Sequence, residues 1–310
     1  MPVTVSASAL LKQRLVRFTR VLPGVEHGDV RSLHRARVAT RRLRELLPVL
    51  QLDAEVSSKL GRRLRKVTRR LGSVRELDVL LLVIDELTAS QPQHRDALRR
   101  VQVVVAKSRD EARKRLLAHL PANELWRLAR KLERVAGRLK RDEQDRSERK
   151  KDVRRNPLRA KTPAWAIDAR IAHRASRVAA ALRDAGHIYV PERLHVVRIA
   201  TKKLRYALEL APTTNTDRAQ ALRTLKRLQE LLGRMHDLQV LIDRVRDVQA
   251  SLMPPNLAVW RELDALIVAL DEACRRLHAR YVRDRETIAA VVARLAAAPP
   301  APTRRERRAG

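Results

Sequence analysis

The chain has 310 residues, and 45% of them are hydrophobic, a share that allows a real buried core and excludes wholesale disorder. Lysine and arginine number 68 against 35 acidic residues, so the net charge is +33 and a negatively charged partner is favoured. Aromatic residues make up 2%, which argues against a protein that stacks single-stranded bases on aromatic rings. The single cysteine, Cys274, excludes an intramolecular disulfide and a zinc site built from several cysteines.

Apolar residues recur at helical spacing along almost the whole chain, and glycines are few, so the sequence predicts an all-α fold. In the first half we expect helices over residues 5–22, 29–51, 54–71, 74–89, 92–119 and 123–142. In the second half we expect helices over residues 163–185, 190–211, 217–232, 235–250 and 256–296. Pro48 lies inside one of these segments and predicts a kink or an early end there. Gly72 and Gly233 each follow a segment at the point where we expect the helix to stop.

The predicted helices form two groups, over residues 1–142 and 164–296. Residues 143–163 carry many charges and almost no apolar side chains, which predicts a solvated linker or a frayed helical extension. Residues 297–310 end in a run of arginines and predict a disordered basic tail. The first ten residues lack the apolar stretch of a signal peptide, and no apolar run is long enough to span a bilayer. We therefore expect a cytoplasmic protein.

One segment of the sequence occurs twice, 161 residues apart. Residues 33–44 read LHRARVATRRLR and residues 194–205 read LHVVRIATKKLR, with seven of twelve positions identical. A second pair of segments, residues 64–80 and 225–241, matches at the same offset without a gap. Two matched blocks at one offset indicate an internal duplication.

Each copy of the repeated segment carries a row of basic residues beside its apolar face. On a helical wheel, the apolar stripe of the first copy contains Leu33, Ala36, Thr40, Leu43, Leu47 and Leu50. The basic row of the first copy, which we call the first basic row, is His34, Arg37, Arg41 and Arg44. The second basic row, at the matching positions, is His195, Arg198, Lys202 and Arg205.

A run of like charges is usually no more than a solvated helix face, because such charges repel one another at these spacings. A solvated face, however, has no reason to keep the same four basic positions in both copies. We therefore expect both rows to bind an anion, and arginine is well suited to phosphate oxygens. The rows contain no carboxylate that could hold a magnesium ion, so they predict binding of phosphates without their cleavage.

Further basic residues flank the rows. Arg42 and Lys203 match each other next to the rows, and we include both in the candidate site. The following helix of each copy adds Arg62, Arg65 and Arg69 in the first half and Arg223, Lys226 and Arg227 in the second. Most of these lie opposite an apolar face and suit a solvated surface, but Arg65 and Lys226 are expected to reach the site. Arg75 either pairs with Asp78, three residues later, or reaches the anion.

The two copies, LHRARVATRRLRELL with LGSVRELDVLL and LHVVRIATKKLRYAL with LLGRMHDLQVLI, resemble the CHAD family, the conserved-histidine α-helical domain. The resemblance covers the chain from about residue 8 to 295. It implies one domain of two four-helix-bundle-like halves with long helices, related by pseudo-twofold symmetry around a central basic groove or pore. It also implies binding of inorganic polyphosphate and association with polyphosphate granules. His236 departs from the pattern, since an uncharged or small polar residue is expected there.

Other functions fit less well. The sequence has no P-loop, HExxH, GxSxG or EF-hand motif, so we expect no enzyme, no cofactor and no metal site. His34 and His195 could meet across the halves, but the surrounding cations disfavour a metal ion. A non-specific DNA- or RNA-binding protein is the main alternative, although no helix-turn-helix stands out. A membrane surface is weaker still, because no helix combines a basic face with exposed Trp or Phe.

The histidines of the two rows predict a pH dependence. An unperturbed histidine has a pKa near about 6.5 and could gain a proton when a polyanion lies beside it. Binding is therefore expected to be tighter at pH 6 than at pH 8.

Overall fold

The structure is a computed structural model that describes residues 6–119, 122–152, 163–211 and 216–297. These residues are almost entirely helical and include no strand, which confirms the all-α prediction. In the first half the helices are α1 (Ala7–Thr19), α2 (Leu22–Glu26), α3 (Val30–Leu46), α4 (Ala54–Ser90), α5 (Arg95–His119) and α6 (Ala122–Asp152). In the second half they are α7 (Pro163–Ala185), α8 (Pro191–Leu208), α9 (Thr216–Ala250) and α10 (Leu257–Ala296).

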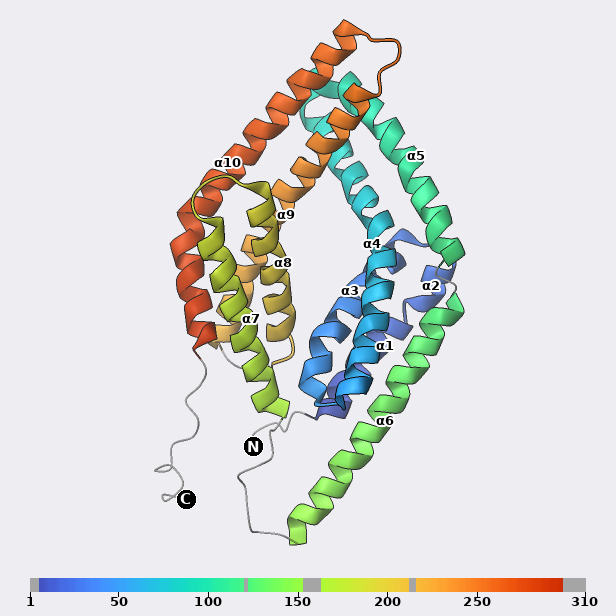
Figure 1. Cartoon of the computed structure of the whole chain (residues 1–310), viewed down its shortest axis with the longest axis vertical. Helices are drawn as coiled ribbons and strands as arrows, with labels where there is room; N and C mark the ends of the chain where they lie inside the picture. Colours follow the sequence, from blue (N-terminus) through green and yellow to red (C-terminus); the bar gives the residue numbers. More distant parts are fainter. Residues whose placement is uncertain (1–5, 120–121, 153–162, 212–215, 298–310) are drawn as a thin grey trace.

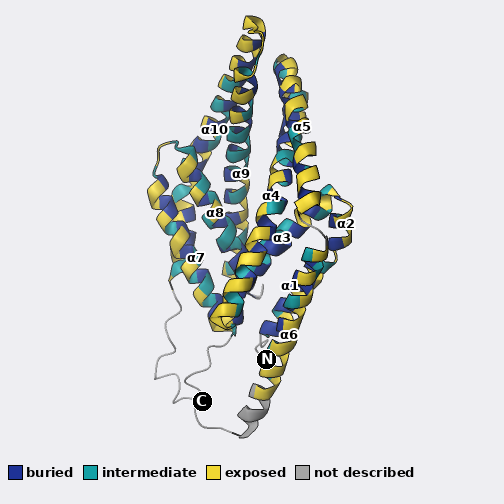
Figure 2. Cartoon of the chain, turned by 45° about the vertical axis from the view of Figure 1, so that its right-hand side comes forward, coloured by how far each residue is buried: buried dark blue, intermediate teal, exposed yellow. Residues whose placement is uncertain are grey.

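The long helices form two antiparallel hairpins that pack against each other. Figure 1 shows α4 with α5 and α9 with α10 as long antiparallel pairs whose far ends meet at the top of the view. The shorter helices α3 and α8 lie near the middle, between the lower parts of the long ones. In Figure 2 buried and exposed residues alternate around each helix, as expected of amphipathic helices that pack on one side. No described helix is both long enough and apolar enough to cross a membrane.

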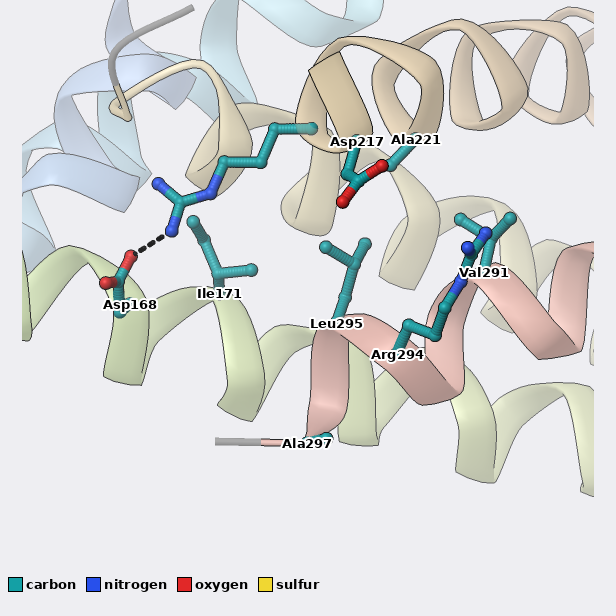
Figure 3. Close-up of a pocket in the computed structure, with 9 residues that line it drawn as sticks. Asp168, Ile171, Asp217, Ala221, Val291, Arg294, Leu295 and Ala297 are labelled. Carbon is teal, nitrogen blue, oxygen red and sulfur yellow. Dashed lines mark hydrogen bonds and ion pairs between the residues drawn. The ribbon is translucent and has the colours of Figure 1, made fainter. Parts of the chain in front are cut away.

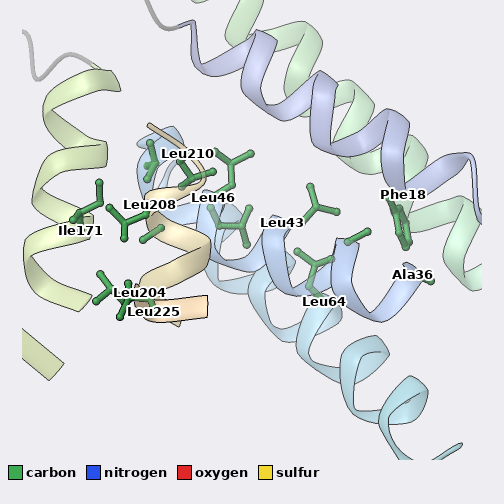
Figure 4. Close-up of a cluster of buried hydrophobic side chains, with 14 of the residues drawn as sticks. Phe18, Ala36, Leu43, Leu46, Leu64, Ile171, Leu204, Leu208, Leu210 and Leu225 are labelled. Carbon is green, nitrogen blue, oxygen red and sulfur yellow. The ribbon is translucent and has the colours of Figure 1, made fainter. Parts of the chain in front are cut away.

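Two hydrophobic clusters make the core, and both halves of the chain contribute to each. The larger one contains Leu43 and Leu64 of the first half and Leu204 and Leu225 of the second, and Figure 4 draws all four as parts of one cluster. The second cluster joins the outer parts of α4 and α5 to those of α9 and α10. Since burial of apolar surface is the main stabilising term, the two halves stabilise each other.

Several helix ends follow from local sequence. The side chains of Ser6, Asp29 and Asn256 accept hydrogen bonds from backbone N–H groups in the first turns of α1, α3 and α10. The early end predicted from Pro48 is confirmed, because α3 stops at Leu46 and a 3₁₀ turn, Leu47–Leu50, follows. The segment expected over 5–22 is interrupted after α1, and α2 begins with proline in its first turn, where the missing N–H is tolerated.

The helix ends predicted at the two glycines are wrong. Helix α4 runs through Gly72 and α9 runs through Gly233 without interruption. At position 72 a Cβ atom would lie 3.3 Å from Nη2 of Arg37, so glycine there makes room for a guanidinium group. At position 233 nothing lies within 4 Å of such an atom. A glycine inside a helix costs only about 1 kcal/mol relative to alanine, which the packing of these long helices offsets.

The helix boundaries follow the sequence repeat. Val30 at the start of α3 and Pro191 at the start of α8 lie 161 residues apart, and α4 and α9 begin and end within a residue or two of the same offset. The pseudo-twofold relation of the halves stays a prediction. Helix α6 extends to Asp152, inside the expected linker 143–163. Residues 153–162 of that linker and residues 298–310 of the expected tail lie outside the described residues.

Candidate functional site

A pocket of about 490 Å³ lies between α3 and α8 and is closed by residues of α4 and α9. Every member of both basic rows lines it, although the rows are separated by about 150 residues of sequence. Arg75 and Lys203 line it as well. The two rows predicted from sequence are therefore brought together from the two halves of the chain.

The other predicted site residues lie outside this pocket. Arg42 donates to the carboxylate of Glu209 at 2.8 Å, and its guanidinium lies 5.9 Å from the ring centroid of Tyr206. The remaining six lie on exposed faces of α4 and α9, namely Arg62, Arg65, Arg69, Arg223, Lys226 and Arg227. Of these, Arg65 lies near Arg44, the last member of the first row. Burial is the main cause of the lowered pKa of Arg44, and the charge of Arg65 is the next. Lys226 instead lies 3.9 Å from Glu230 on its own helix.

Sequence reasoning missed three carboxylates that line the pocket, on Glu45, Glu76 and Asp237. Glu45 is buried and accepts hydrogen bonds from both Arg170 and Arg174 of α7, the shortest at 2.7 Å. It thereby links α3 in the first half to α7 in the second. The only sequence signal was an acid beside the basic row, and its partners are 125 and more positions away.

The other two carboxylates each approach one arginine of a basic row. Glu76 accepts from Arg37 at 3.3 Å and is otherwise exposed. Asp237 lies 3.9 Å from Arg198, and its burial raises its pKa. Eight lysines and arginines line the pocket against these three acids, so the pocket keeps a strong positive excess.

Burial and mutual repulsion penalise the charges of the two rows. The pKa of Lys202 falls to about 7, first because the side chain is partly buried and then because Arg198, Arg41 and Arg37 lie close by. Burial, followed by the charge of Arg41, lowers the pKa of Arg37 to about 10. An anion placed among these groups would relieve this penalty.

Three arginines of the pocket each have one buried N–H donor that makes no hydrogen bond within the described part of the chain. The Nε atoms of Arg37, Arg198 and Arg205 are buried and have no hydrogen-bond partner among the described residues. A buried donor without a partner is unfavourable by about 1–3 kcal/mol, so native structures seldom leave one without a reason. These donors line a cationic pocket, where the acceptor oxygens of an anion could pair with them.

The histidines of the pocket are held uncharged. His195 and His236 lie with their Nδ1 atoms 3.3 Å apart, and burial, then Arg198, lowers the pKa of His236 to about 3. An uncharged or small polar residue was expected at position 236, and this low pKa keeps the imidazole of His236 uncharged at neutral pH. Burial, then the charge of Arg75, also lowers the pKa of His34. Among the described residues no three His, Cys, Asp or Glu side chains are grouped to hold a metal ion.

Asp78 pairs with a residue other than Arg75. Asp78 accepts a hydrogen bond from Nε of Arg109 in α5 at 3.1 Å, while Arg75 lines the pocket. Of the two roles considered for Arg75, its position therefore favours contact with an anion.

The fold and the pocket define a class, an all-helical protein with a cationic pocket between two helices from its two halves. The CHAD domain family model matches residues 9–246, and the chain belongs to the CHAD family. The CHAD domain from the plant Ricinus communis is similar in structure, with a TM-score of 0.64 and 20% identity over 94% of this chain and 93% of that one. PptA from Streptomyces chartreusis aligns with a TM-score of 0.61 and 16% identity over 88% and 96% of the two chains. No curated protein matches the sequence.

The Glu45 contacts predict a large loss of stability when this carboxylate is removed. Glu45→Ala leaves Arg170 and Arg174 half-buried without their counter-charge, which should reduce the free energy of unfolding by about 3–5 kcal/mol. Guanidinium-induced unfolding followed by circular dichroism measures the change. Glu76→Ala is the matched control, because Glu76 is 67% exposed and should contribute less than about 1 kcal/mol. Equal effects of the two substitutions would contradict the structural role assigned to Glu45.

Proposed function

We propose that this protein binds inorganic polyphosphate in the pocket between α3 and α8 and does not hydrolyse it. The observation that carries the proposal is the convergence of both basic rows, with buried guanidinium donors that lack partners. A linear phosphate polymer offers acceptor oxygens and negative charge at every unit along its length. Such a ligand can satisfy cations spread along two helices, whereas a single small anion can reach only some of them.

Membership of the CHAD family supports the choice of polyphosphate, because the family is associated with polyphosphate binding. The size of the pocket supports it too. A volume of about 490 Å³ is in the range of small-molecule sites, so an unbranched chain suits it better than a nucleic-acid duplex. The proposal includes a cytoplasmic location and association with polyphosphate granules.

The pocket's carboxylates support binding rather than phosphoryl transfer. Phosphoryl transfer relies on carboxylates that hold magnesium against the phosphates. Here the oxygens of Glu45 accept from two arginines, and Glu76 and Asp237 each face an arginine of a row. These carboxylates are therefore used to position cations.

Non-specific nucleic-acid binding is the second candidate, and one observation favours it. Arginines and a lysine are exposed on α4 and α9 outside the pocket, where they could contact a phosphodiester backbone. Salt dependence alone does not separate the two functions, since both involve release of counterions.

A competition titration separates the two candidates. Labelled long-chain polyphosphate would be displaced from the protein by unlabelled polyphosphate, duplex DNA, RNA or heparin at one salt concentration. We expect polyphosphate to compete at least about tenfold better per phosphate than DNA or RNA, a difference of about 1.4 kcal/mol. Equal competition per phosphate would overturn polyphosphate as the preferred ligand.

The pocket residues predict which substitutions abolish binding. Replacing Arg37, Arg41, Arg198 and Lys202 together by alanine should weaken polyphosphate binding by at least about a hundredfold, because each removes a charge-assisted contact. The slope of log affinity against log salt should fall by about three. Fluorescence titration at several salt concentrations measures both quantities.

A matched variant controls for net charge. Replacing the exposed Arg62, Arg69, Arg223 and Arg227 by alanine removes the same number of basic side chains from α4 and α9 outside the pocket. It should weaken binding by less than about fivefold. Equal losses in the two variants would show that binding is diffuse and does not depend on the pocket.

Lys202 predicts the pH dependence of binding. Its pKa of about 7 in the free protein should rise when phosphates lie beside it, so binding takes up a proton above that pH. Affinity should therefore fall by about tenfold from pH 6 to pH 8. In Lys202→Arg the guanidinium stays charged throughout, and this part of the pH dependence should disappear. An unchanged pH profile in Lys202→Arg would assign the effect to the histidines or to the ligand.

A further inference from the structure

Helix α7 carries a third row of basic residues that the repeat does not explain. Arg170, His173, Arg174 and Arg177 are spaced by 3, 1 and 3 residues, which places them on one face of the helix. We call them the α7 row. His173 and Arg177 are exposed, while Arg170 and Arg174 are half-buried against Glu45.

The α7 row adjoins one end of the pocket. Glu45 lines the pocket and is held by Arg170 and Arg174, so these two arginines stand directly behind the pocket wall. Lys203 lines the same end, together with Arg44. After burial, the charges that lower the pKa of Lys203 include those of Arg174 and Arg177, so both arginines come close to it. Positive charge thus continues from the pocket onto the surface of α7.

The row belongs to the second half alone. At the repeat offset of 161 residues, the positions that match it are Ala9, Lys12, Gln13 and Val16 of α1, of which only one is basic. The row is therefore not repeated at the matching positions of the first half.

The opposite face of α7 offers no comparable surface for an anion. There Asp168, with residues of α9 and α10, lines a smaller hollow of about 210 Å³. Figure 3 shows the carboxylate of Asp168 paired with Arg218, and Asp217 faces the same space. This hollow mixes charges of both signs, whereas the α7 row has only basic members.

We propose that a polyphosphate chain too long for the pocket leaves it between Arg44 and Lys203 and continues along α7 over Arg177 and His173. This inference rests on the proposed function. From Arg170 to Arg177 the helix rises by about 10 Å, so the α7 row lengthens the cationic path well beyond the pocket. A short chain contacts the pocket alone, whereas a long chain contacts both surfaces. The α7 row thus makes the protein prefer long chains.

The test compares two ligands on the whole chain. In the double variant His173→Ala with Arg177→Ala, affinity for long-chain polyphosphate should fall by about fivefold, and the salt slope should fall by about one. Affinity for tripolyphosphate, which fits within the pocket, should stay unchanged. Both side chains are exposed, so the substitutions leave the core intact.

Arg183→Ala is the matched control, because Arg183 is exposed on α7 and lies away from the row. It should leave the affinity for both ligands unchanged. The path over α7 is overturned if long-chain affinity is unchanged in the double variant, if Arg183→Ala weakens it equally, or if tripolyphosphate binding falls as much. Failure of the unaltered protein to bind either polyphosphate would instead refute the proposed function, and the path with it.

Discussion

The carboxylate of Glu45 joins the two halves of the chain where positive charge is densest. It is buried on α3 and pairs with two arginines of α7. The first half of the chain thus supplies an acid to cations of the second half. Without such a counter-charge, two basic helices from opposite halves would repel each other at short range. Glu209 acts in the same way near the C-terminal end of α8, where it accepts from Arg42 of the first half. These contacts let the apolar faces of α3 and α8 share one core.

The acids compensate only part of the charge. They pair with the arginines of α7 and with Arg37 and Arg198 of the rows, but Lys202 remains half-buried among arginines. The free protein therefore keeps cations and guanidinium donors in position before any ligand arrives. An anion that binds finds these groups already ordered, so little conformational entropy is lost on binding. The two core clusters, to which both halves contribute, hold the helices that carry these groups in place.

Much of this arrangement follows from the sequence alone. The helical class and both basic rows could be predicted, because helical periodicity and the repeat are local patterns that a wheel reveals. The contacts of Glu45 could not, since its partners on α7 are fixed only by tertiary packing. The glycines misled the prediction of helix ends, because a glycine after an apolar stretch is the usual signal for a stop. The α7 row could have been predicted from the helical spacing of residues 170, 173, 174 and 177. It was not, because these residues lie outside the repeated segments.

Gly72 and Gly233 occupy matching positions in the repeat, yet their surroundings differ. A side chain at position 72 would press on the guanidinium of Arg37, whereas a side chain at position 233 would meet open space. An alanine at position 233 therefore has room, whereas an alanine at position 72 requires the guanidinium of Arg37 to shift by a few tenths of an ångström. The repeated glycine is thus packed against a pocket cation in the first half alone, so the two copies of the segment tolerate different side chains at the same repeat position.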